Sequence, residues 1–166
     1  MLPEIARRYL LCSIEGAPDV FECLLLHLPG HDVRWDFSPD PDRFTLREIM
    51  AHQADFNNVF LDRLERTTKE NESLLSNWDE GQAALRNNYA QSDARESLRR
   101  FRSSRKRVVE FLNTLPTELW SRVAMREGVG RLTLEEQAVF FAAHDGYHLQ
   151  QVSEWLQKAQ VPFPTA

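Results

Sequence analysis

Two histidines near the end of the chain have a spacing that suits metal binding. His144 and His148 are four residues apart in a segment with helical periodicity. In a helix this spacing places both side chains on one face, about a turn apart, and helices present two imidazoles to one metal ion in this way. Gln151 and Trp155 extend the same face, so the two histidines are expected to point inward. We therefore predict that the pair binds a metal ion.

His52 is the candidate for a third ligand. It stands between Ile49 and Phe56 on the apolar stripe of another helical segment. A single histidine on such a stripe is more often a core residue, but three inward-facing histidines out of five favour a shared site. Three neutral imidazoles leave at least one coordination position open, which is typical of catalytic metal sites. Imidazole ligands suit Zn, Ni, Fe or Mn, and the number of ligands does not indicate which of these divalent ions is bound.

Three polar residues close to the histidines are candidates for lining a pocket or orienting a ligand. Gln151 lies one turn beyond His148, where it either contacts the site or packs in the core. Asp55 and Asp145 are close to the histidines in sequence, although an exposed helix carboxylate is the favoured interpretation of each. Tyr147 is expected to face elsewhere. No general base is identified, so the catalytic residues are unknown.

Two helix starts are well marked. Thr45 to Glu48 and Thr133 to Glu136 each form a Thr-x-x-Glu capping box directly before apolar periodicity. The helices that they begin are predicted to end near Thr67 and Gln160, and the second of them precedes Pro162.

Two further long helices complete the set. The first is expected over residues 3–28, with a kink or break at Gly16-Ala17-Pro18. The other follows the Ser92-Asp93 cap and ends near residue 115. A short helix is expected around residues 82–89, and residues 117–131, with two glycines, are interpreted as an irregular crossing.

Four amphipathic helices bury their apolar stripes most simply by packing together. We therefore predict an all-α fold, a four-helix bundle that forms a single domain over residues 1–166. The long connections after the first and third helices permit crossovers, and the pattern leaves the order of the helices open.

Composition excludes several classes of protein. The net charge of -5 argues against a nucleic-acid binder, and the basic run from Arg99 to Arg107 is interpreted as the solvated side of a helix. No apolar run approaches the ~18 residues of a membrane span, and the N-terminal residues show no signal-peptide pattern. Cys12 and Cys23 would lie roughly 16 Å apart along one helix, too far to join. Reduced thiols and a cytoplasmic location are expected.

Two other pairs of possible metal ligands are weaker candidates. Cys23 and His27 are also four apart, but they lie on a leucine-rich face without a third ligand. His27 and His31 are separated by Pro29-Gly30, which ends the helical register.

The segments around the three histidines resemble one family. Residues 45–56 and 144–151, with the motif His-Asp-Gly-Tyr-His in the latter, look like the DinB/YfiT superfamily of metalloenzymes, and the similarity covers essentially the whole chain. One departure is Phe44, which stands where many members have Trp. The resemblance implies a bundle in which His52, His144 and His148 hold a divalent metal ion, and a homodimer.

The resemblance also implies a class of activity. Characterised members include transferases that use low-molecular-weight thiols such as bacillithiol or mycothiol. The expected function is therefore a metal-dependent transferase or hydrolase, in which the metal activates a thiol or water for attack on a small molecule. The alternative is a non-enzymatic, stress-related bundle that binds metal and functions as a dimer.

Overall fold

Four long helices form the frame of the molecule. The computed structural model describes residues 2–70 and 72–160. The long helices are α1 (Glu4–Leu25), α2 (Leu46–Lys69), α4 (Ala94–Asn113) and α5 (Leu134–Lys158). The smaller elements are the helix α3 (Glu80–Arg86), the 3₁₀ turns η1 (Val33–Asp36), η2 (Tyr89–Gln91) and η3 (Thr117–Ser121), and the strands β1 (Ser73–Leu75), β2 (Val123–Arg126) and β3 (Gly130–Thr133).

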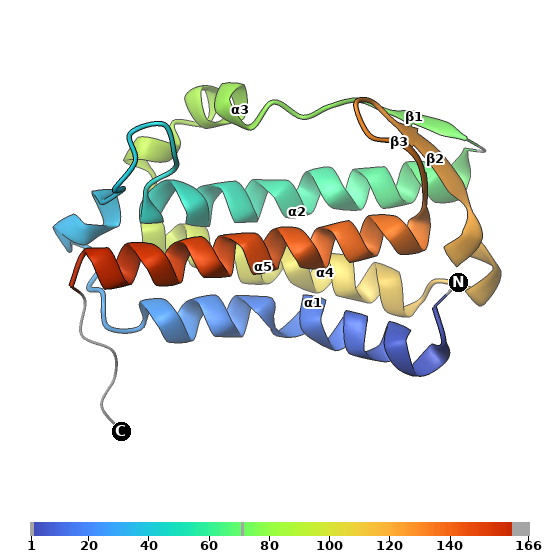
Figure 1. The fold of residues 1–166 in the computed structure, drawn as a ribbon, viewed down its shortest axis with the longest axis horizontal. Coiled ribbons are helices and arrows are strands. Elements are labelled where there is room, and N and C mark those ends of the chain that lie inside the picture. The colour runs from blue at the N-terminus through green and yellow to red at the C-terminus, as the bar shows by residue number, and fades with distance from the viewer. Residues whose placement is uncertain (1, 71, 161–166) are drawn as a thin grey trace.

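The predicted four-helix bundle with a crossover is confirmed, but the crossover follows the second long helix and not the first or the third, whose connections join antiparallel helices. Figure 1 shows α1 and α5 running in one direction and α2 and α4 in the other. The chain between α2 and α4 travels back along the length of the bundle through β1 and α3 (Figure 1), and this return makes α2 and α4 parallel. As a result, α2 and α5, which carry the three histidines, are antiparallel neighbours.

Both predicted capping boxes are present. The Thr45 hydroxyl accepts a hydrogen bond from the Glu48 backbone, and the Glu48 side chain accepts one from the Thr45 backbone. Thr133 and Glu136 make the same reciprocal pair at the start of α5. Each box satisfies backbone N–H groups that have no partner inside the helix. These two caps therefore fix where the histidine-bearing helices begin.

Of the kink or break expected in the first helix, the break is wrong, because α1 continues through Pro18. A proline inside a helix has no N–H to donate to the carbonyl four residues earlier, which here belongs to Ile14. That carbonyl accepts a hydrogen bond of 2.6 Å from the buried Arg105 side chain of α4. A partner from another helix thus replaces the bond that proline removes.

The expectation of an irregular crossing over residues 117–131 is also wrong. After η3, strands β2 and β3 form an antiparallel hairpin, and β1 pairs with β2 in parallel. Gly128 lies in the turn and Gly130 is the first residue of β3; both have positive φ, a conformation that glycine adopts without steric cost. Strands of three or four residues are too short to show a period of two in the sequence.

The apolar core consists of two clusters, one toward each end of the bundle. One contains Phe21, Trp35, Phe101 and Trp155, and the other contains Phe60, Trp120, Leu134 and Phe141. At the level between them, the long helices contribute buried polar side chains: Gln53, Asn57, Ser104, Arg105, Asp145, His148 and Gln151. The histidines therefore belong to a polar layer in the middle of the bundle.

Two further observations concern the surface. In the described part of the chain, no helix combines the length and the apolar character that crossing a membrane requires. Cys12 and Cys23 are exposed and unpaired, as expected from their separation along one helix.

Candidate metal centre

The structure brings the three predicted histidines together. His52 comes from α2, and His144 and His148 come from successive turns of α5. The Nε2 atoms of His52 and His144 are 3.0 Å apart, and one nitrogen of each of the three rings lies within 4.8 Å of the others. His52 and His148 are buried, and His144 is half-buried.

Aromatic rings fix the positions of the imidazoles. The His52 ring lies nearly parallel to Phe56, with centroids 5.8 Å apart, and Trp78 stacks on it at 5.4 Å. Phe56 also contacts His144 at a centroid distance of 4.1 Å. Trp78 belongs to the segment between β1 and α3, so this crossover covers one side of the histidine cluster.

Burial keeps all three imidazoles neutral. It lowers the pKa of His52 to about 3 and that of His144 to about 2, and neighbouring histidine charges add to both shifts. It lowers the pKa of His148 to about 4, against an opposing hydrogen bond with Gln151. A neutral imidazole has a free lone pair, which is the form that binds a metal ion.

The donor set fits a metal ion. When two nitrogens bind the same ion at ~2.0–2.1 Å in a tetrahedral site, they lie roughly 3–3.5 Å apart. The Nε2 atoms of His52 and His144 are 3.0 Å apart, which is close to this distance. The His148 Nδ1–H donates to the Gln151 Oε1 at 2.9 Å, which leaves the His148 Nε2 unprotonated. Ligating histidines commonly donate their other ring N–H in this way. Gln151 therefore orients His148.

A carboxylate that the sequence did not reveal stands beside the cluster. The Glu80 Oε2, at the start of α3, is 3.9 Å from the His52 Nε2. Glu80, His144 and His148 line a cavity of about 160 Å³ together with Arg43 and Tyr147. The crossover places Glu80 there, far from any histidine in sequence, so no local spacing could have indicated it.

Tyr147 contradicts the expectation that it faces away from the site. Its ring packs edge-on against His148, with centroids 5.0 Å apart. Its hydroxyl accepts a hydrogen bond from Arg43 at 2.9 Å. The half-buried Phe44 lines the same cavity, and its ring centroid lies 5.3 Å from that of His52.

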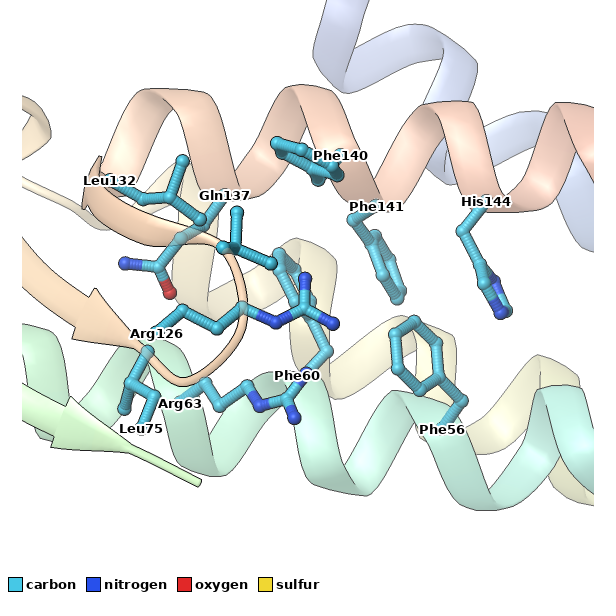
Figure 2. A pocket seen from close by; sticks show the side chains of 11 residues that line it. Phe56, Phe60, Arg63, Leu75, Arg126, Leu132, Gln137, Phe140, Phe141 and His144 are labelled. Atoms are coloured by element: carbon cyan, nitrogen blue, oxygen red, sulfur yellow. The ribbon is translucent and has the colours of Figure 1, made fainter. Parts of the chain in front are cut away.

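A second cavity reaches the cluster from the other side, at His144. It measures about 210 Å³ and runs between α2, α5 and the hairpin (Figure 2). Phe56, Phe60, Phe140 and Phe141 form much of its wall. Figure 2 shows Phe56 and Phe141 between His144 at one end and two arginine side chains farther along. His144 lines both cavities.

Asp145 is buried, and its interpretation as an exposed helix carboxylate is wrong. It is 3% exposed and accepts two hydrogen bonds from Arg105, at 2.6 and 2.8 Å, and one from Gln53 at 3.1 Å. Burial raises the pKa of the Asp145 carboxyl, and the Arg105 guanidinium opposes that shift. Asp145 lines neither cavity, so it supports the helix segment between the two histidines.

Arg105 corrects the interpretation of the basic run as a wholly solvated face. Arg99, Arg100, Arg102 and Arg107 are exposed, but Arg105 is 2% exposed. The sequence does contain a signal for this, since Arg105 follows Phe101 by four residues and precedes Val108 by three. That is the spacing of the buried stripe of α4.

The structure does not bring Asp55 to the cluster. It accepts hydrogen bonds from Asn87 and from the Tyr89 hydroxyl, and it pairs with Arg100 at 2.6 Å. Asp55 therefore ties the α3–η2 segment and α4 to α2. His27, from the weaker alternative pairs, is exposed and lies outside the described histidine cluster.

Fold and site together define a helical bundle with a cluster of three neutral histidines between two cavities. The chain belongs to the DinB superfamily, whose family model matches residues 14–152. It is similar in structure to YfiT from Bacillus subtilis, described as a probable metal-dependent hydrolase with an unusual four-helix bundle topology. The TM-score is 0.88 at 17% sequence identity, over 96% of this chain and 91% of that chain. No curated protein matches the chain.

The central ion pair yields a prediction about stability. Arg105→Met leaves the Asp145 carboxylate buried without its partner, which lowers the free energy of unfolding by about 3–5 kcal/mol. The measurement is urea unfolding at pH 7.5. Arg102→Met removes an exposed arginine of the same helix and costs less than about 1 kcal/mol. Replacing both members, with Arg105→Met and Asp145→Leu, restores most of the loss. Equal losses for Arg105→Met and Arg102→Met would contradict this account.

The low histidine pKa values predict acid sensitivity. Each folded-state pKa lies below the ordinary value of 6.5, so below about pH 6.5 the unfolded chain binds more protons than the folded chain. The free energy of unfolding of the metal-free protein is therefore highest above pH 6.5 and falls as the pH is lowered toward 5, by up to about 1.4 kcal/mol per pH unit for each histidine. Urea unfolding at pH 7.5, 6 and 5 measures the slope. His144→Gln reduces it, and the exposed His27→Gln does not.

Proposed function

We propose that this protein is a metal-dependent hydrolase of small molecules. The observation that carries the proposal is the convergence of His52, His144 and His148 on one point between two cavities. The description of YfiT as a probable metal-dependent hydrolase supports the same class of reaction. Three histidine ligands with an adjoining cavity are the arrangement of a catalytic rather than a structural metal site.

The histidines would hold a divalent ion through their Nε2 atoms. When bound, such an ion lowers the pKa of a water molecule and polarises a carbonyl or similar group. His52 and His144 each have a buried Nδ1 without a hydrogen-bond partner among the described residues, while the Nδ1 of His148 is held by Gln151. His148 is thus the ligand whose orientation the protein fixes most directly.

Glu80 is the residue placed to move a proton. Its carboxylate is close to His52 and lines the cavity with His144 and His148. A carboxylate in that position accepts a proton from water during attack on the substrate and returns it to the leaving group. Arg43 and Tyr147 line the same cavity and are joined by a hydrogen bond.

Thiol transfer is the second candidate function. His144 lines both cavities, so the site has room for a thiol on one side and an electrophile on the other. The same ion would lower the pKa of a thiol instead of water. A homodimer would be the functional unit in either case.

Metal binding tests the site itself. We expect the purified chain to bind about one equivalent of Zn²⁺, and His52→Ala, His144→Ala and His148→Ala each to weaken binding by roughly 100-fold or more. Gln151→Ala, which frees the His148 ring, costs about 10-fold. The exposed His27→Ala serves as the control and retains full affinity. Isothermal titration with Zn²⁺ gives these values, and unchanged affinity in all three ligand variants would overturn the site.

Activity tests the role of Glu80. With the Zn²⁺-loaded protein and 4-nitrophenyl esters, Glu80→Gln is expected to retain the metal and lower kcat by about 10²-fold. Glu118→Gln, at an exposed position in η3, leaves kcat unchanged. Product release that requires added thiol would favour the transferase, and an inert metal-loaded protein in both assays would favour the non-enzymatic alternative.

A further inference from the structure

Two arginines lie in the apolar cavity without an acidic partner. Arg63 of α2 is 6% exposed, and Arg126 at the end of β2 is half-buried. Among the residues that the structure describes, no carboxylate forms an ion pair with either guanidinium. Both side chains line the cavity that ends at His144. A buried positive charge is usually paired, so two neighbouring unpaired ones require an explanation.

The hydrogen bonds that the protein supplies do not satisfy this end of the cavity. Arg63 donates one bond, of 3.0 Å, to the Ser76 carbonyl. The Nε–H of Arg126 is buried and has no partner among the described residues, and its guanidinium lies 5.9 Å from the Phe140 ring centroid. The Gln137 Oε1, in the same cavity, is also buried without a partner. The two guanidinium groups thus leave donors and positive charge available to a ligand, and Gln137 leaves one acceptor.

The two charges act on each other. Burial, together with the neighbouring charge of Arg126, lowers the pKa of Arg63 to about 10, and the charge of Asp62 opposes that shift without forming an ion pair. Figure 2 shows the two side chains extending in the same direction, Arg126 from the hairpin and Arg63 from α2, with their guanidinium groups next to each other. An anion between them would relieve this repulsion and accept their hydrogen bonds, and a carboxylate matches the planar fork of a guanidinium.

The space between the arginines and His144 is apolar. Phe56 and Phe141 lie between the guanidinium groups and the His144 ring in Figure 2, and Phe60 stacks on Phe141 with centroids 3.8 Å apart. The whole cavity holds about 210 Å³, and a cavity of ~150 Å³ accommodates benzene. One aromatic ring or a short aliphatic chain, with a charged end, therefore fits its size and its lining.

We infer that Arg63 and Arg126 form the binding site for a carboxylate of the substrate, whose apolar body lies along the phenylalanines and whose reacting group reaches His144. The substrates are then small amphipathic acids, cleaved at a bond away from the carboxylate. The cleavage at the histidines rests on the proposed function. The binding of the carboxylate by Arg63 and Arg126 does not.

The test uses the full chain freed of metal by a chelator, so that a carboxylate cannot bind through an ion. Isothermal titration at pH 7.5 compares 3-phenylpropanoate with its neutral analogue 3-phenylpropanamide. The acid is expected to bind at least 10-fold more tightly than the amide. Arg126→Gln removes that preference, and so does Arg63→Gln. Arg131→Gln, at an exposed arginine of β3, preserves it.

Several results would overturn the inference. These are equal affinity for acid and amide, no detectable binding of either at millimolar concentration, and a preference that persists in both arginine variants. The comparison of acid with amide in the unmodified chain remains decisive if Arg63→Gln, which also loses the bond to Ser76, fails to fold. A failure of Zn²⁺ binding would overturn the proposed function alone, because the acid–amide comparison contains no metal.

Discussion

One buried guanidinium connects all four long helices. Arg105 of α4 donates to the Ile14 carbonyl of α1, to the Asn57 side chain of α2 and to the Asp145 carboxylate of α5. A charge at 2% exposure persists only because every one of these partners is in place. Such an interaction adds little net stability but penalises any packing that separates the partners, so it selects one register of the helices. The rest of the structure depends on that register.

The chemistry of the site follows from the same layer. Asp145 immediately follows His144, so the bonds that hold its carboxylate inside the bundle also set the rotation of α5. That rotation turns His144 and His148 toward α2, where their rings contact His52. Burial then keeps the imidazoles neutral and available as ligands. A polar layer between two apolar clusters thus provides both the alignment of the helices and the ligands.

Much of this was predictable because it is local. The capping boxes at Thr45 and Thr133 and the period of the apolar residues defined the helices, and helical spacing put His144 and His148 on one face. The spacing of Arg105 from Phe101 and Val108 also indicated that Arg105 is buried, although its neighbours in the basic run are exposed. By contrast, the continuity of α1 at Pro18 depends on a hydrogen bond from α4, and the pairing of β1 with β2 joins segments about fifty residues apart in the chain. Neither has a signal in its own segment.

The sequence by itself therefore determined the four helices, the inward face of the histidines and, through the resemblance, the family. Only the tertiary structure decided which other residues surround them. Glu80, Trp78 and the pair Arg63 and Arg126 reach the site or its cavity from the crossover, α2 and the hairpin. The physical reason is that periodicity reports which face of an element is buried, whereas a cavity is defined by side chains from elements whose contact depends on the path of the whole chain.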